Sequence, residues 1–386
     1  MAVILWATEA IPIAVVGVVG VVLLVLVGAV PDFGTALYGF SQPVAYFLVG
    51  ILTLGLAVQR SGLAQRMATY LMRGAGGSPR LLYVQMLFSF AALTFALPSA
   101  STRGAIMVHV YEQVLQHWNV PREHPLYKAM MVAMGSLNRL GSTALLAGGI
   151  TPVVASGLLG DFSWTQWFVL MSVPFYANLV VGGTVLFVFY RSGFRLDDAA
   201  VAASVSLGRM SPTEMRAAAI VMLTALLWFT DFAHGLHPAV PALIAMCLIL
   251  LPRVGILTWS EFERNLGWSN FFIIASSLSL SHTLVTTGAA AWFSETLVGG
   301  VSQLTSAPML ILLALCVCFA LLRMLLPNIA GYLALVIPVT MAAAESLGLD
   351  PLIFRFGITM TVIAAVVLLF LVIPYWGLIG HPLVPP

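Results

Sequence analysis

Three hydroxyl side chains and a guanidinium interrupt a long apolar run in the stretch LPSASTRGAIMVH, residues 97–109. The hydroxyls belong to Ser99, Ser101 and Thr102, and the guanidinium belongs to Arg103. Hydroxyls and uncapped backbone carbonyls can replace the water shell of a sodium ion. A guanidinium instead holds a carboxylate, sulfate or phosphate through two parallel hydrogen bonds. The cluster therefore predicts a site for a small anion, for sodium, or for both.

A second polar group lies in the glycine-rich stretch GSLNRLGSTALLAGGITP, residues 135–152. Its four glycines and one proline argue against a single regular helix. Its polar residues are expected to supply further sodium ligands, namely Asn138, Gly141, Ser142 and Thr143. Arg139 is a second candidate to bind the anion, and Asn328 is the matching candidate for substrate or sodium in a second interrupted run.

Arg103 and Arg139 are also open to a structural interpretation. Ionisable residues inside apolar segments are functional candidates by default, because their burial is costly. Either arginine is equally compatible with satisfying backbone carbonyls, with reaching the cytoplasmic surface, or with pairing to Glu112. The sequence leaves these alternatives open.

The composition is that of a protein embedded in lipid. Hydrophobic residues make up 61% of the 386 residues and charged residues only 8%, whereas about a quarter of a soluble domain is charged. The net charge of +2 gives no indication of a nucleic-acid partner. Apolar runs long enough to cross a bilayer, about 20 residues, predict an all-α polytopic protein of a bacterial inner membrane. These runs lie at about 10–30, 43–59, 81–115, 126–160, 165–190, 215–233, 237–252, 268–287, 307–345 and 351–380.

Two of these runs are too long for one crossing and are interrupted near their middle. Pro98 interrupts residues 81–115, and Pro327 interrupts residues 307–345. Backbone that leaves the helix at membrane depth is tolerated only where protein or a cavity covers it. Each run is therefore expected to form a re-entrant hairpin.

The run after each hairpin is expected to be a broken helix. The first of these runs is 126–160, and the second is 351–380, which Pro374 interrupts. Loop charges orient the hairpins, because cytoplasmic loops carry an excess of arginine and lysine. The loop before the first hairpin holds four arginines and no acid, whereas the loop before the second carries only Glu295. The first hairpin is thus expected to enter from the cytoplasm and the second from outside.

The two halves of the chain resemble each other. EAIPIAVVGVVG near the start matches HGLHPAVPALIA, and 50 residues separate Pro12 from Gly62 as well as Pro238 from Gly288. Chance similarity between leucine- and valine-rich segments is the alternative. The opposed hairpins favour an inverted repeat, the architecture of many secondary transporters, whose broken elements meet near the midplane. The expected parts are a first repeat at 1–190, a cytoplasmic linker at 191–216 and a second repeat at 217–386.

Two features predict contact with the membrane surface. The stretch LAQRMATYLMR, residues 63–73, is amphipathic and basic and is expected to lie along the cytoplasmic surface. Four tryptophans near the ends of apolar runs predict an aromatic belt: Trp164, Trp167, Trp259 and Trp268.

Several segments resemble the divalent-anion:sodium symporter family. They are WATEAIP near the start, GLHPAVPALIA and TWSEFERNLGWSNFFIIA in the second half, and the two interrupted hairpins. That family moves dicarboxylates, citrate or sulfate with sodium, as an elevator-type homodimer. The resemblance therefore implies an elevator mechanism, a homodimer and a small anionic substrate.

The family carries a Ser-Asn-Thr motif at each hairpin tip and a Thr-Pro break in the helix that follows. Here Ser99-Ala100-Ser101 stands in the place of the first motif, and Asn328-Ile329, or the triplet shifted by one residue, stands in the place of the second. Thr151-Pro152 matches the first break, whereas the second keeps only Pro374. The resemblance implies that the residues at these positions bind substrate and sodium.

The leading prediction is a secondary transporter of small anions, with sodium as the coupling ion and no other cofactor. Arg103 and Arg139 are hypothesised to offset the amides that the altered motifs lack. The alternatives are a sodium-independent exchanger or related antiporter, and a homologue that no longer transports. The sequence is also expected to be a fragment or a shortened member, because the family's terminal crossings are absent. An enzyme is not expected, since no nucleophile motif, metal-ligand set or phosphate loop is found.

Overall fold

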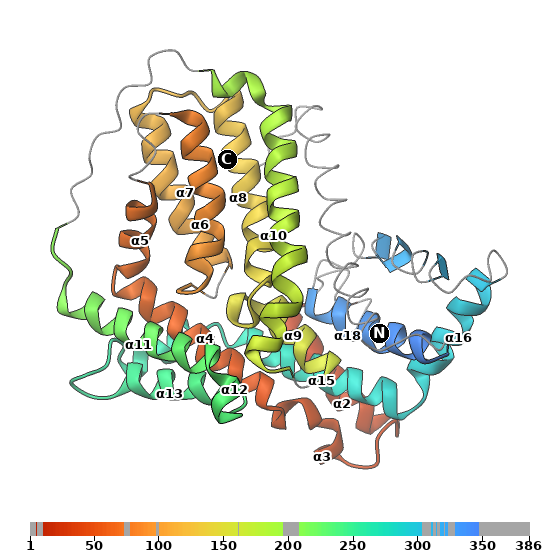
Figure 1. Cartoon of the computed structure of the whole chain (residues 1–386). Coiled ribbons are helices and arrows are strands. Elements are labelled where there is room, and N and C mark those ends of the chain that lie inside the picture. The colour runs from red at the N-terminus through yellow and green to blue at the C-terminus, as the bar shows by residue number, and fades with distance from the viewer. Residues whose placement is uncertain are drawn as a thin grey trace. The chain divides into compact units, whose positions relative to one another are not determined.

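The structure is a computed structural model, and it describes the following residues: 5, 11–72, 78–97, 100–160, 162–195, 208–302, 310, 311, 314, 317–319, 321, 322 and 329–346. All secondary-structure elements in this part of the chain are helices, and it contains no strand (Figure 1). Its elements are α2 (Ile13–Leu26), α3 (Phe33–Ala36), η1 (Tyr38–Ser41), α4 (Pro43–Arg60), α5 (Leu63–Met72), α6 (Pro79–Thr94), α7 (Ala100–His117), α8 (Pro125–Thr143), η3 (Leu146–Gly148), α9 (Ile150–Leu159), α10 (Trp164–Phe189), η4 (Arg191–Phe194), α11 (Pro212–Phe229), α12 (Asp231–His234), α13 (Ala239–Leu250), α14 (Trp259–Asn265), α15 (Ser269–Thr286), α16 (Ala289–Ser302) and α18 (Ile329–Ser346).

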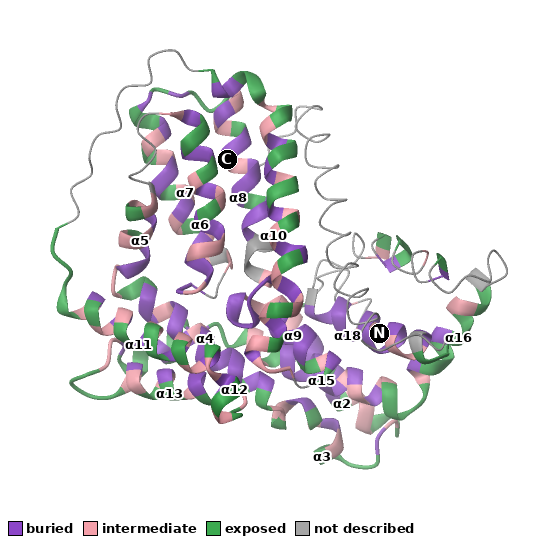
Figure 2. Ribbon diagram, in the orientation of Figure 1, coloured by how far each residue is buried: buried purple, intermediate pink, exposed green. Residues whose placement is uncertain are grey.

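Three of the described helices, α4, α10 and α11, are long and apolar enough to cross a membrane. A fourth crossing is provided if α15 and α16, which meet at a bend of 72°, are taken as one broken span. Much of the surface of α10 is exposed valine, including Val169, Val173 and Val180 (Figure 2). Apolar side chains on the outside of a long helix are typical of contact with lipid.

The predicted first hairpin is divided into two helices. α6 begins at Pro79, where Ser78 caps it by accepting a hydrogen bond from the Leu81 N–H, and it ends at Thr94. The chain leaves the helix at Phe95 and resumes as α7 at Ala100. α6 and α7 contact each other and lie side by side (Figure 1). The division falls next to Pro98, because a residue that precedes proline is disfavoured in a helix.

The run 126–160 is also broken. α8 ends at Thr143, the short η3 follows, and α9 begins at Ile150. Between them Gly149 adopts an extended backbone, with φ 166° and ψ −174°. The glycine-rich sequence thus interrupts the helix in its second part, while Asn138 remains inside regular α8.

The predicted internal repeat has matching elements in the structure. α2 and α13 begin 226 positions apart, and so do α4 and α15, and α5 and α16. Gly62 and Gly288 also lie 226 positions apart, and each adopts a positive φ, 83° and 75°, between two helices. Only glycine takes that conformation without strain. The opposed orientation of the halves and their boundaries at 190 and 217 stay predictions.

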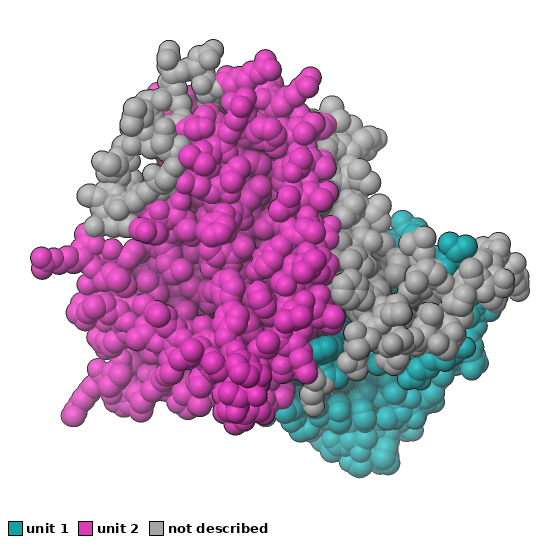
Figure 3. All heavy atoms as spheres, viewed as in Figure 1, with its two compact units in different colours: residues 1–49, 150–162, 267–368 teal, residues 50–149, 163–266, 369–386 magenta. Residues whose placement is uncertain are grey.

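The chain groups into two compact units that are each built from several stretches (Figure 3). Unit 1 comprises 1–49, 150–162 and 267–368, and unit 2 comprises 50–149, 163–266 and 369–386. In unit 1, α15 packs against α2, α9 and α18, and its Ser279 hydroxyl accepts a 2.9 Å hydrogen bond from the Gly39 N–H. In unit 2, α8 packs against α6, α7 and α10. Unit 2 therefore holds the first hairpin together with the helix that follows it.

Two of the four tryptophans expected in an aromatic belt are core residues instead. Trp164 and Trp167 are each 1% exposed. The Trp164 ring stacks on Trp228 and meets Phe229 edge-on, because the first turn of α10 packs against the end of α11. The prediction of a belt was therefore wrong for this pair, whereas Trp259 and Trp268 are exposed.

Candidate functional site

Arg103 is fully buried and ties together three segments around the first interruption. Its Nε donates to the Asn138 side-chain oxygen at 2.6 Å, and its Nη2 donates to the Asn138 carbonyl at 2.9 Å. Its Nη1 donates to the Leu97 carbonyl at 2.8 Å. Leu97 lies beyond the end of α6, where carbonyls lose their helical partners. The guanidinium therefore replaces hydrogen bonds that the broken helix cannot make.

Asn138 completes the connection from its place inside α8. Its Nδ2 donates to the Ala100 carbonyl at the start of α7, at 2.8 Å. Gly104 makes this approach possible, since a Cβ there would lie only 3.1 Å from the Asn138 Nδ2. One amide and one guanidinium thus link the end of α6, the first turn of α7 and the middle of α8.

Arg103 has no acidic partner in the described part of the chain. The two ion pairs found there are Arg66–Glu214 at 2.8 Å and Arg122–Glu112 at 3.3 Å. The oxygens that bind Arg103 are all neutral. A buried charge costs several kcal/mol when no opposite charge compensates it. The charges of the described residues are therefore compatible with the predicted anion site, whose role stays a prediction.

Comparison with known proteins identifies the family of this chain. Residues 1–380 match the family described as sodium:sulfate symporter transmembrane region. The chain belongs to that family. The resemblance predicted from the sequence is thereby confirmed, as are the multi-pass membrane protein and its bacterial inner-membrane type, since the relatives are bacterial.

Two curated relatives and one solved structure are similar to this sodium:sulfate symporter family member. The L-tartrate/succinate antiporter of Escherichia coli (strain K12) is 25% identical over 384 residues, which cover 89% of the chain and 76% of the relative. A membrane protein of Cupriavidus necator is 22% identical over 347 residues, which cover 86% of the chain and 66% of the relative. The fold matches the Alcanivorax borkumensis YdaH transporter with a TM-score of 0.54, at 15% identity, over 89% of the chain and 86% of that structure. The all-α transporter fold is thus confirmed.

The structure decides between two of the structural alternatives for Arg103 in this symporter family protein. Its guanidinium donates hydrogen bonds to backbone carbonyls and does not pair with Glu112. Glu112 lies near the other end of α7, where it accepts hydrogen bonds from the Tyr127 hydroxyl at 2.8 Å and from Arg122. This contact with carbonyls leaves anion binding a prediction, because no acidic side chain among the described residues pairs with Arg103.

Other predicted site residues lie in the broken elements. Thr102 directly precedes Arg103 in the first turn of α7 and is half-buried. Thr143 is the last residue of α8, and its carbonyl accepts a 3.2 Å hydrogen bond from the Trp167 Nε1. Thr151 and Pro152 form the first turn of α9, in unit 1.

The remaining predicted residues fall partly or wholly outside the described residues. Five have a described helical backbone but side chains outside that description: Ser101, Arg139, Gly141, Ser142 and Ile329. Ala100 is described as the first residue of α7. Ser99, Asn328 and Pro374 lie outside the described residues altogether. Their proposed roles stay predictions.

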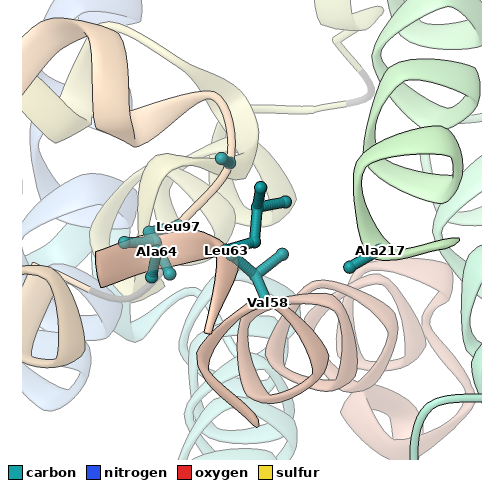
Figure 4. Close-up of a cluster of buried hydrophobic side chains, with 6 residues drawn as sticks. Val58, Leu63, Ala64, Leu97 and Ala217 are labelled. Carbon is teal, nitrogen blue, oxygen red and sulfur yellow. The ribbon is translucent and has the colours of Figure 1, made fainter. Parts of the chain in front are cut away.

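Sequence reasoning missed Leu97. Besides its carbonyl, its buried side chain joins a cluster with Val58, Leu63, Ala64 and Ala217 (Figure 4). This cluster fixes the segment after α6 against α5 and the start of α11. The signal was the Leu97-Pro98 pair, since a residue before proline leaves the helix and frees a carbonyl.

Proposed function

We propose that this protein is a secondary transporter that exchanges small dicarboxylates across the membrane. The observation that carries the proposal is Arg103, a fully buried cation whose described partners are neutral oxygens. A guanidinium in this setting binds a carboxylate strongly and with defined geometry. The anion would supply the negative charge that no described residue brings to Arg103.

The same charge favours exchange over sodium-coupled uptake. When no anion is bound, the cation stays uncompensated in a medium of low dielectric constant, so movement of the empty site is costly. A bound carboxylate group gives that cation an opposite charge, so the loaded site moves more readily than the empty one. A carrier whose empty form does not move can only exchange one anion for another.

The position of Asn138 supports this choice. Its side-chain oxygen, predicted as a sodium ligand, faces the Arg103 Nε at 2.6 Å. A sodium ion on that oxygen would lie beside a like charge, which is unfavourable. The guanidinium therefore takes the place that a coupling cation would otherwise fill.

The dicarboxylate class is proposed from those relatives that carry the name L-tartrate/succinate antiporter. Sodium-coupled symport is the second candidate, because the family is described by a sodium:sulfate symporter. An elevator-type movement and a homodimer, which the family resemblance implies, are part of the proposal. The described fold supports a transporter of this class through its likeness to YdaH.

Uptake into proteoliposomes tests the proposal. Labelled succinate, L-tartrate, citrate, sulfate and phosphate are offered to vesicles that are empty or preloaded with unlabelled succinate, with and without an inward sodium gradient. We expect succinate or L-tartrate uptake in preloaded vesicles only, at the same rate without sodium. Uptake into empty vesicles that requires the sodium gradient would establish symport instead. No uptake of any anion would favour a homologue that does not transport.

A further inference from the structure

The two arms of the first hairpin expose different kinds of side chain. α6 exposes large apolar side chains at positions that share one face of a helix, namely Leu81 at 44%, Val84 at 57% and Phe88 at 63%. α10, which packs against α6, likewise exposes a row of valines. Apolar side chains on the outside of a membrane helix are typical of contact with lipid. This side of the hairpin therefore has the composition of a lipid-facing surface.

α7 exposes a polar face instead. Its exposed residues are Ala105, His109, Gln113, Gln116 and His117. The first four are separated by four, four and three positions, so they lie along one face of the helix. No large apolar side chain is exposed among the described residues of α7. We call the face formed by Ala105, His109, Gln113 and Gln116 the polar face of α7.

The polar face leads to the candidate site. Thr102, in the first turn of α7, precedes Ala105 by three positions and so continues the same face. Its neighbour in that turn is Arg103. The other end of the face is Gln116 in the last turn, and the 18 residues of α7 rise by about 27 Å. The face therefore joins the predicted anion site to the base of the hairpin, which the loop charges predict to be cytoplasmic.

His109 and Gln113 are polar groups in the middle of this arm. Their Nε2 atoms lie 3.2 Å apart in an exposed hydrogen bond that spans one helical turn. Polar and ionisable side chains inside the membrane almost always face the protein interior or a water-filled cavity, because lipid offers them no hydrogen bonds. The packing of α7 against α5, α6 and α8 leaves the polar face uncovered. Water is therefore the expected neighbour of this face.

We infer that the polar face of α7 lines a water-filled path by which the anion reaches the site from the base of the first hairpin. The inference rests on the proposed function and adds the path of the substrate. Imidazole and amide N–H groups on this face can donate hydrogen bonds to a passing carboxylate. Glu112, the one acid of α7, is half-buried and accepts hydrogen bonds from Tyr127 and Arg122. The face itself therefore presents no negative charge that would repel the substrate.

The first measurement asks whether the polar face is in water. Gln113→Cys and His109→Cys are compared with Val84→Cys, which lies on the apolar face of α6 in the same hairpin. A charged methanethiosulfonate reagent is supplied on both sides of the proteoliposome membrane, and peptide mass spectrometry distinguishes the new cysteine from the native ones. The reagent attacks the thiolate, which forms in water and is disfavoured in apolar surroundings. We expect both α7 variants to react at least about tenfold faster than Val84→Cys.

The second measurement asks whether the anion uses this path. Gln113→Cys is modified with an anionic sulfonatoethyl reagent or with a cationic aminoethyl reagent of similar size, and succinate exchange is then measured. A fixed negative charge on the path repels a dicarboxylate, whereas a positive charge does not. We expect the anionic reagent to slow exchange at least about five-fold and the cationic reagent to change it by less than about two-fold.

His109→Cys is treated in the same way, so that the test does not depend on one substitution. Val84→Cys is the matched control, and neither reagent should change its exchange rate. Labelling of both α7 variants at the slow rate of Val84→Cys would overturn the inference, because the face would then lie in lipid or against protein. Exchange that both reagents slow equally, or that neither slows, would also overturn it, because passage of an anion must depend on the charge along its path. Fast labelling of α7 in a wild-type background that transports no anion would instead overturn the proposed function, and the path with it.

Discussion

Replacement of Arg103 by lysine is expected to raise the KM for succinate exchange by at least about 100-fold. Lysine keeps the positive charge but lacks the planar fork that reaches the Asn138 side chain, the Asn138 carbonyl and the Leu97 carbonyl together. Two buried hydrogen bonds to a charged group are then lost, each worth about 1.5–3 kcal/mol. Initial exchange rates over a range of succinate concentrations give the KM.

The matched control is Arg122→Lys. The Arg122 side chain is 77% exposed, and its 3.3 Å contact with Glu112 lies at the surface. Exposed pairs contribute at most about 1 kcal/mol, so this variant should exchange like the wild type. Wild-type KM in Arg103→Lys would show that the three contacts do not shape the site.

The hypothesis that Arg103 and Arg139 offset missing amides fails if alanine at both positions leaves the transport of every anion unchanged.

Replacement of Asn138 by aspartate is expected to abolish most succinate binding without unfolding the protein. The new carboxylate would stand beside the Arg103 Nε, where the amide oxygen now accepts at 2.6 Å. It would give the buried cation a permanent counter-ion. Succinate would then compete with the protein's own carboxylate, and we expect its affinity to fall by at least about tenfold, or 1.4 kcal/mol. Melting temperature and succinate KM are measured on the same preparation.

Asn178→Asp separates this effect from the loss of an amide donor. Asn138 donates to the Ala100 carbonyl, and Asn178 donates to the Pro174 carbonyl in α10, both at 2.8 Å. Each aspartate therefore loses one comparable hydrogen bond, but only the one at 138 meets a guanidinium. Unchanged succinate affinity in Asn138→Asp would contradict the claim that the anion balances the charge of Arg103. An equal loss of affinity in Asn178→Asp would contradict it as well.

Local sequence signals predicted the positions where helices break. A residue that precedes proline is disfavoured in a helix. Pro98 therefore located the interruption between α6 and α7. Glycine located the break after α8. The equal spacing to Gly62 and Gly288 indicated an internal repeat, and the structure adds that both glycines have a positive φ. These features depend on one or two residues and their neighbours, so a single sequence is sufficient to find them.

The partners of Arg103 could not be predicted in this way. Asn138 lies 35 positions away, and only the packing of α7 against α8 brings the amide to the guanidinium. The sequence suggested three structural roles for Arg103 besides anion binding and offered no means to choose between them. The prediction for Trp164 and Trp167 was wrong for the same reason. Their sequence positions suggested a membrane interface, whereas tertiary contacts with α11 and α8 bury both side chains.

We propose that Arg103, a buried guanidinium with no acidic partner among the described residues, binds the anion and makes a coupling cation unnecessary. Calorimetric titration of succinate into the purified protein, in a buffer whose only monovalent cation is choline, tests it directly. We predict saturable binding without sodium, an unchanged Kd when sodium is added, and a large loss of binding in Asn138→Asp. Binding that appears only when sodium is present would contradict the account.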